Sequence, residues 1–254
     1  MRKAIANLCF CLLLLTAPSV VWAACNKPLT VGWESWKPFM YVGENGQLTG
    51  LDIELIQAVA KRMDCTLRFV EMPFKRHMLE LENGRIDLAT SVQFTAERER
   101  YALYSKPYRE SQMRLAMLSG EVANYPLTQL EQLRDRSLRL GITRGYFYGP
   151  GVEALIADPG QLTIEDAISD KVNLAKLEAG RIDGFFVDPI VLASLAPAAG
   201  RIELHPLAVH SSSFHFIASS ESVSVQLMQA FDEALAQLQA SGELQAIVGR
   251  YQLH

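Results

Sequence analysis

One phrase occurs twice in this chain. Residues 79–92 read LELENGRIDLATSV, and residues 174–188 read LAKLEAGRIDGFFVD. In each copy a helical pattern stops at a glycine, Gly84 or Gly180, and an apolar run follows. Glycine adopts the left-handed conformation that closes a helix, and a short apolar run suits a strand buried on both faces. The repeat therefore predicts two related α/β lobes, each with a helix that leads into a parallel strand.

Hydrogen-bonding side chains follow the apolar strand of the first copy, which we expect over residues 86–89. They are Thr90, Ser91 and Gln93. In α/β sheets, ligands bind beyond the carboxyl ends of such strands. Thr95 then occupies the N-cap position of a short helix whose first turn contains Arg98. These donors converge on a small volume, which predicts a site for a carboxylate. A solvated helix face is the alternative for Arg98, because residues 97–100 form a charge run.

The second copy ends in an acid instead. Asp188 is followed by Pro189, a pair that is typical of an N-cap and first helical position. A cap uses one carboxylate oxygen and leaves the other for a ligand ammonium, so both interpretations stay open. Across a cleft from Arg98, Asp188 would complete a site for a zwitterion such as a free amino acid.

The chain begins like an exported protein. Arg2 and Lys3 precede an apolar run over residues 8–15, and residues 21–23 (VWA) suit a cleavage site. An uncleaved membrane anchor is the alternative, but the run is short for a span and Pro18 interrupts it. We expect residues 1–23 to be a cleaved signal peptide and the mature chain to be periplasmic and not embedded in a membrane.

Two cysteines remain after cleavage, Cys25 and Cys65. They lie just before the first two expected strands, residues 29–33 and 66–70. Parallel neighbouring strands begin side by side, and exported proteins form disulfides, so we expect a Cys25–Cys65 bridge. Lipidation of Cys25 is the alternative, because residues 22–25 (WAAC) loosely resemble a lipobox.

Aromatic residues gather in the loops after these two strands. Residues 33–39 read WESWKPF, and loops in this position bind ligands more often than they merely connect. Trp36 lies between polar neighbours and is placed to stack on a ligand, whereas Phe39 suits the core. Phe74 follows the second strand and is expected near the cleft. Arg76 is interpreted as a solvated or structural cation.

A glycine-rich loop over residues 143–151 follows the first strand expected in the other lobe. Thr143, Gly145 and Tyr146 open the loop, and a helix begins at Val152. The glycines could expose backbone amides to an anion near the helix N-terminus. The loop lacks the GK[ST] of a phosphate-binding loop, and a plain flexible loop is the alternative.

Composition excludes several other classes of protein. The 254 residues carry 24 Lys+Arg and 28 Asp+Glu, with 49% hydrophobic residues. This balance is typical of a globular protein and gives no basic excess for nucleic acid. We expect no cofactor. We also expect no metal, because His205, His210 and His215 lack acids or cysteines at ligand spacing.

Together these segments resemble the family 3 bacterial extracellular solute-binding proteins, the polar amino acid binding components of ABC importers. The matching segments are LTVGWESWKPF, GQLTGLDIELIQAVAKRM, GRIDLATSVQFTAERERYALYSKPY, LRLGITRGY, GRIDGFFVDP and FDEALAQLQASGELQAIVGRY. The resemblance implies an α/β fold of the type II periplasmic binding protein class. In it, two lobes with mainly parallel sheets flanked by helices close on a ligand in the cleft. Lobe 1 is expected over residues 24–115 and 211–254, and lobe 2 over residues 116–210.

The resemblance also implies a binding site. By position in the family, Arg98 holds the ligand α-carboxylate, with help from Thr90, Ser91 or residues 143–146, and Asp188 holds the α-ammonium. Trp36 and Phe74 line the side-chain pocket.

Three residues depart from the family pattern. Gln93 stands where a small Ser or Thr is common, Tyr146 replaces a small hydroxyl residue, and Glu34 matches an acidic position approximately. A bulky Tyr146 and an acid at Glu34 could favour a small or cationic ligand.

We therefore expect a monomeric periplasmic protein that captures a small polar ligand, an amino acid above all, and delivers it to an ABC transporter permease. One alternative is an enzyme of the same fold, similar to a cyclohexadienyl dehydratase, in which Glu34 or Asp188 would supply the acid. No nucleophile and base pair accompanies them, so we expect no catalysis. Delivery of the ligand to a sensor is the other alternative.

Overall fold

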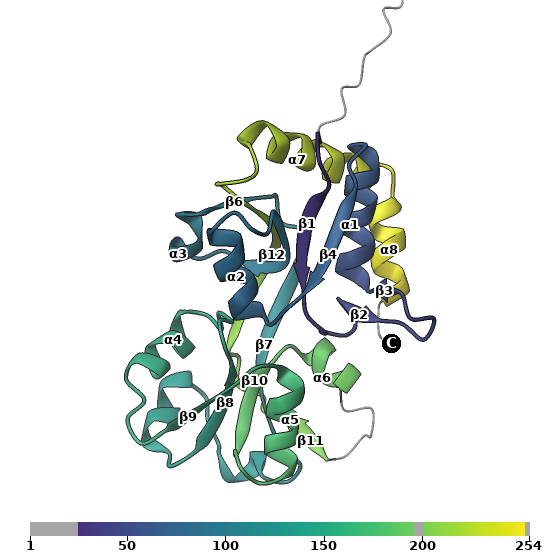
Figure 1. The fold of residues 1–254 in the computed structure, drawn as a ribbon. Coiled ribbons are helices and arrows are strands. Elements are labelled where there is room, and N and C mark those ends of the chain that lie inside the picture. Colours follow the sequence, from purple (N-terminus) through teal and green to yellow (C-terminus); the bar gives the residue numbers. More distant parts are fainter. Residues whose placement is uncertain (1–24, 196–200, 252–254) are drawn as a thin grey trace, which may run out of the picture.

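The computed structural model describes residues 25–195 and 201–251, so the expected signal peptide lies outside the described residues. Figure 1 shows two lobes with strand β7 running between them. The strands are β1 (Leu29–Trp33), β2 (Tyr41–Val42), β3 (Leu48–Thr49), β4 (Leu67–Glu71), β5 (Leu88–Gln93), β6 (Ala102–Tyr104), β7 (Arg109–Leu118), β8 (Arg139–Thr143), β9 (Thr163–Ala167), β10 (Gly184–Val187), β11 (Ile202–Leu204) and β12 (His210–Ser219). The α-helices are α1 (Leu51–Arg62), α2 (Phe74–Glu82), α3 (Ala96–Glu99), α4 (Pro150–Ala157), α5 (Asp170–Glu178), α6 (Pro189–Leu195), α7 (Val225–Ala240) and α8 (Glu243–Tyr251). Two short 3-10 helices are η1 (Val122–Asn124) and η2 (Leu130–Asp135).

Each lobe contains a mainly parallel sheet, as the repeat predicted. In lobe 1, β1 pairs in parallel with β4 and with β5. In lobe 2, β8 pairs in parallel with β9 and with β10. Among the described residues the strand order is β4-β1-β5-β12-β7-β10-β8-β9, so the sheets of the two lobes are continuous through β12 and β7.

The two long strands β7 and β12 carry the chain between the lobes. Residues 109–113 of β7 pair with β12, and residues 114–117 pair with β10 of lobe 2. The expected boundary at residues 115 and 116 therefore falls inside β7. The boundary expected at residues 210 and 211 falls at the beginning of β12.

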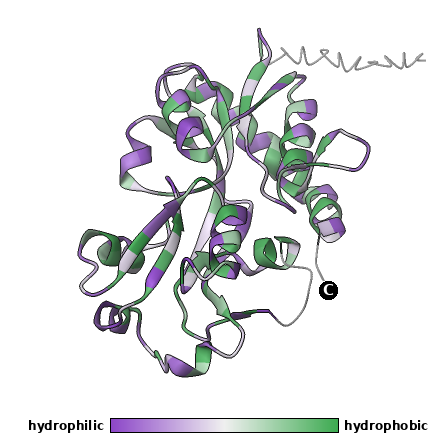
Figure 2. Ribbon diagram, turned by 60° about the horizontal axis from the view of Figure 1, so that its bottom comes forward, coloured by the Kyte–Doolittle hydropathy of each residue, from purple (hydrophilic) through white to green (hydrophobic). Residues whose placement is uncertain are grey.

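Helices cover the sheets through their apolar sides. Helix α1 buries Ile53, Leu55, Ile56 and Val59 completely, and it contacts α7 and α8. Figure 1 shows α1 and α8 side by side, and Figure 2 shows helices that carry both hydrophobic and hydrophilic residues. Burial of each large aliphatic side chain contributes about 1.5–3 kcal/mol to folding, so this side of α1 fixes it on lobe 1.

The two copies of the repeat have the same local structure. Gly84 follows α2 and Gly180 follows α5, with φ angles of 68° and 64°, which confirms the left-handed helix stops. The first strand is displaced from its expected position, because β5 begins at Leu88 and continues through Gln93. Antiparallel pairing with β12 extends it, since Phe214 pairs with Gln93. The polar residues at its end are thus held in the sheet.

A disulfide joins Cys25 to Cys65, with 5.3 Å between their Cα atoms. It lies where the parallel strands β1 and β4 begin, so the expected bridge is confirmed and its sulfur atoms are not free for lipidation. Within the described residues, no helix is both long enough and apolar enough to cross a membrane.

Candidate functional site

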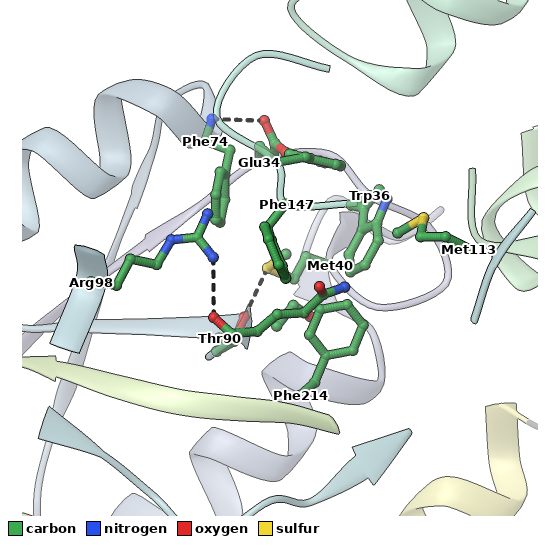
Figure 3. A pocket seen from close by; sticks show the side chains of 12 residues that line it. Glu34, Trp36, Met40, Phe74, Thr90, Arg98, Met113, Phe147 and Phe214 are labelled. Atoms are coloured by element: carbon green, nitrogen blue, oxygen red, sulfur yellow. Dashed lines mark hydrogen bonds between the residues drawn. The ribbon is translucent and has the colours of Figure 1, made fainter. Parts of the chain in front are cut away.

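A small, partly open cavity of about 30 Å³ lies between the lobes, with room for a few water molecules. Figure 3 shows Arg98 and Trp36 on opposite sides of it. Its walls come from the ends of β1, β5 and β8 and from the two crossing strands. The lining residues are Glu34, Trp36, Met40, Phe74, Thr90, Ser91, Gln93, Arg98, Met113, Tyr146, Phe147 and Phe214. Eight residues of the expected site are therefore brought together here.

Arg98 brings a buried positive charge to this cavity. The Thr95 side chain caps α3 by accepting from the Arg98 backbone N–H, and the Arg98 residue is only 8% exposed. Its guanidinium donates to the Gln93 carbonyl at 3.1 Å and, across the cleft, to the Gly145 carbonyl at 2.8 Å. Burial lowers the pKa of Arg98. Since no ion pair among the described residues involves Arg98, its charge is available for a ligand anion.

Glu34 brings the opposite charge and also contacts the other lobe. Its carboxylate accepts from the Phe74 N–H at 2.9 Å and from the Tyr146 hydroxyl at 2.6 Å. Burial raises the pKa of Glu34 to about 7, and the charge of Asp170 adds to this rise. Tyr146 therefore connects the lobes through an acid that titrates near neutral pH.

The three polar residues of β5 have different surroundings. The Thr90 hydroxyl contacts the Met40 sulfur at 3.1 Å, a weak hydrogen bond. The Ser91 hydroxyl is hydrogen-bonded to Asp52 and accepts from Arg109, so it is already engaged. Gln93 is 4% exposed, and its Oε1 atom has no hydrogen-bond partner in the described part of the chain.

Thr143 and Gly145 contribute from behind the cavity wall. The Thr143 hydroxyl donates to Asp170 at 2.7 Å, and Asp170 accepts from the Trp36 indole at 3.0 Å. Gly145 contributes the carbonyl that contacts Arg98. Thr143 is thus linked through Asp170 to Trp36, and Gly145 is bonded directly to Arg98, while neither lines the cavity itself.

Asp188 lies outside the residues that line the cavity. It is 3% exposed and accepts from the Ile190 N–H at 2.8 Å, as its capping interpretation predicted. Burial raises the pKa of Asp188, and the charge of Arg109 opposes this rise. Its role as an acceptor for a ligand ammonium stays a prediction.

The sequence interpretation missed a second arginine, whose side chain is 10% exposed. Arg109 lies at the start of β7, stacked 3.7 Å from the Phe39 ring centroid and 4.0 Å from that of Phe214. It forms an ion pair with Asp52, at 3.3 Å. The available signal was the position of Arg109 at the start of a strand whose second half is apolar, since a charge taken out of water there needs a partner. Asp170 was also missed, although Ser169 and Asp170 form a helix start.

A two-lobed α/β protein with a buried arginine at its cleft, one that forms no ion pair with the described residues, has the architecture of a solute-binding protein. The chain belongs to the bacterial extracellular solute-binding proteins, family 3, whose profile matches residues 29–254.

Related proteins and solved structures agree with this assignment. The chain is 24% identical over 218 residues to the probable amino-acid-binding protein YxeM of Bacillus subtilis, covering 84% of this chain and 79% of that protein. It is 25% identical over 224 residues to the L-cystine-binding protein TcyJ of Escherichia coli, covering 86% and 80%. An ancestral arginine-binding protein bound to arginine shares the fold, with a TM-score of 0.78, 23% identity and 89% and 98% of the two chains covered. A weaker match, 28% identical over 149 residues, is the cyclohexadienyl dehydratase of Pseudomonas aeruginosa, covering 58% of this chain and 47% of that enzyme.

Proposed function

We propose that this protein is a periplasmic solute-binding protein that captures an amino acid and delivers it to an ABC importer. Its family membership and the names of the relatives YxeM and TcyJ support an amino acid as the ligand. The observation that carries the proposal is the desolvated guanidinium of Arg98 at the cleft, because a ligand carboxylate would pair with it.

In this proposal Arg98 holds the carboxylate, and the free Oε1 of Gln93 accepts a hydrogen bond from the ligand ammonium. Trp36 and Phe74 line the space for the side chain. Thr90 exchanges its weak contact with Met40 for a better hydrogen bond to the ligand.

A thermal-shift screen of refolded, ligand-free mature protein tests the proposal. We expect at least one amino acid to raise the melting temperature, because a ligand at 100 times its Kd adds about 2.7 kcal/mol to the stability of the native state. Sugars and dicarboxylic acids without an amino group serve as controls. A screen in which no amino acid shifts the transition contradicts the proposal.

Catalysis by the same site is the second candidate. Two observations favour it: the dehydratase relative and the pKa of Glu34 near 7, since a general acid works best when its pKa is close to the ambient pH. If the protein is an enzyme of this kind, pure protein will turn over arogenate or prephenate and Glu34→Gln will abolish the turnover. We expect no turnover with either substrate.

A further inference from the structure

A second, larger space adjoins the cavity. This outer chamber has a volume of about 330 Å³ and is lined by residues of both lobes, among them Asp170 and Val191. Glu34, Trp36 and Tyr146 line both spaces and form the wall between them. Because the inner cavity is small and shares this wall with the outer chamber, a long side chain on a ligand held by Arg98 extends toward the wall and, by displacing part of it, toward the outer chamber.

The wall is held by two hydrogen bonds that cross between the lobes, and each ends on an acid. Tyr146 of lobe 2 donates to Glu34 of lobe 1 at 2.6 Å. Trp36 of lobe 1 donates to Asp170 of lobe 2 at 3.0 Å. Displacing the wall therefore frees one carboxyl group from each lobe at the same place.

Neither acid has a cation partner among the residues that the structure describes. No ion pair in residues 25–195 and 201–251 involves Glu34 or Asp170, although Asp170 is only 5% exposed. Burial raises the pKa of Glu34 to about 7 and that of Asp170 to about 6. The two lysines that line the outer chamber, Lys37 and Lys171, are exposed at its rim. A ligand cation would thus meet two acids, the half-buried Glu34 and the buried Asp170, that the described part of the chain leaves without an ion pair.

The inner cavity provides an independent sign that the ligand carries a hydrogen-bond donor as well as a carboxylate. Gln93 Oε1 is a buried acceptor without a donor in the described part of the chain, and buried polar atoms are normally hydrogen-bonded. The acceptor lies in the same cavity wall as Arg98. A ligand with a carboxylate and an ammonium group satisfies both residues and leaves its side chain directed at the wall.

Building on the proposed function, we propose that the ligand is an amino acid whose side chain ends in a cationic group, and that Glu34 and Asp170 hold this group where the inner cavity meets the outer chamber. The cation then replaces the two hydrogen bonds that cross the cleft. Since one acid belongs to each lobe, the ligand itself holds the lobes together.

Calorimetric titrations with matched ligand pairs test this inference. Arginine is compared with citrulline, which has the same shape without the charge, and lysine with norleucine. We expect at least one cationic ligand to bind at least tenfold more tightly than its neutral partner. Asp170→Asn and Glu34→Gln should each reduce this ratio to about threefold or less. The control Glu71→Gln, an exposed acid at the rim of the same chamber, should leave the ratio unchanged.

The outcomes separate the inference from the proposed function. If the wild type binds citrulline as tightly as arginine, and norleucine as tightly as lysine, the inference is wrong, although the protein still binds amino acids. This result does not depend on the folding of any variant. Unchanged ratios in both variants also overturn it. If the wild type binds no amino acid, both the inference and the proposed function are wrong.

Discussion

Arg98 is the residue on which ligand affinity should depend most. It is a charge that folding has removed from water without a carboxylate partner in residues 25–195 and 201–251. A ligand carboxylate would supply that partner in a low-dielectric site, where truncating one member of a charged pair costs about 2–5 kcal/mol.

We therefore expect Arg98→Gln to weaken amino acid binding by about 100-fold or more in calorimetric titrations. Arg100→Gln is a matched control, because Arg100 lies two residues further along the chain and is exposed. If both variants melt like the wild type and bind the ligand equally well, Arg98 does not hold the ligand.

Glu34 should make the stability of the ligand-free protein depend on pH. Its pKa is raised from 4.5 to about 7, so between these values the folded protein retains a proton that the unfolded chain releases. The stabilisation that this bound proton gives to the folded state is thus fully present below about pH 4.5. It is lost as the pH rises from there through about 7.

Glu34→Gln removes the carboxyl group and with it this difference in proton binding between the folded and unfolded states. We expect the variant to have nearly the same free energy of unfolding as the wild type at pH 5. At pH 8 we expect the variant to be more stable by up to about 3 kcal/mol. Urea denaturation at both pH values measures the difference, with Glu71→Gln as the exposed control. A difference between Glu34→Gln and wild type that is the same at both pH values would contradict the expected titration.

Local patterns predicted part of the site. Arg98 and Gln93 line one cavity because a strand end and an N-cap fix their positions within a few residues, and their part in ligand binding stays a prediction. The partners of Arg109 and Asp170 come from segments far away in the sequence, Asp52 and Trp36, so no local pattern contains them. Buried charge pairing is decided by tertiary packing, which single-sequence patterns do not report.

At the scale of elements, the repeat predicted the two parallel sheets and both helix stops, because period and glycine placement are local properties. The extension of β5 through Gln93 was not predicted. It depends on antiparallel pairing with β12, which arrives from the other end of the chain.

The disulfide between the starts of β1 and β4 should contribute to stability and not to binding. It closes a loop with a sequence separation of 40 residues, for which the chain-entropy relation gives about 4 kcal/mol. The cavity lies at the carboxyl end of β1, away from the bridge.

We expect the double variant Cys25→Ser, Cys65→Ala to lose about 3–4 kcal/mol of unfolding free energy in urea and to retain ligand affinity within about twofold. Reductant should destabilise the wild type to a similar extent and leave the double variant unaffected; a wild type insensitive to reductant contradicts the bridge.

At the scale of the whole molecule, the lobes are closed on each other through side chains of the protein itself. Tyr146 and Trp36 cross the cleft to reach Glu34 and Asp170, and Arg98 reaches Gly145. Each such hydrogen bond contributes about 1 kcal/mol net. Hinge closure in a two-lobed protein is an equilibrium, so these bonds favour the closed state before any ligand arrives.

Removing two of these bonds should open the ligand-free protein. The double variant Tyr146→Phe, Trp36→Phe loses about 2 kcal/mol of closing energy, which shifts the equilibrium about 30-fold toward the open state. By small-angle X-ray scattering we expect a larger radius of gyration than in the wild type without ligand. The radius should return to the wild-type value on saturation with the amino acid that raises the melting temperature most.

Tyr41→Phe, which changes a partly buried tyrosine of β2, should scatter like the wild type. Identical radii of the double variant and the wild type without ligand would mean that packing across the cleft, and not these hydrogen bonds, keeps the lobes together.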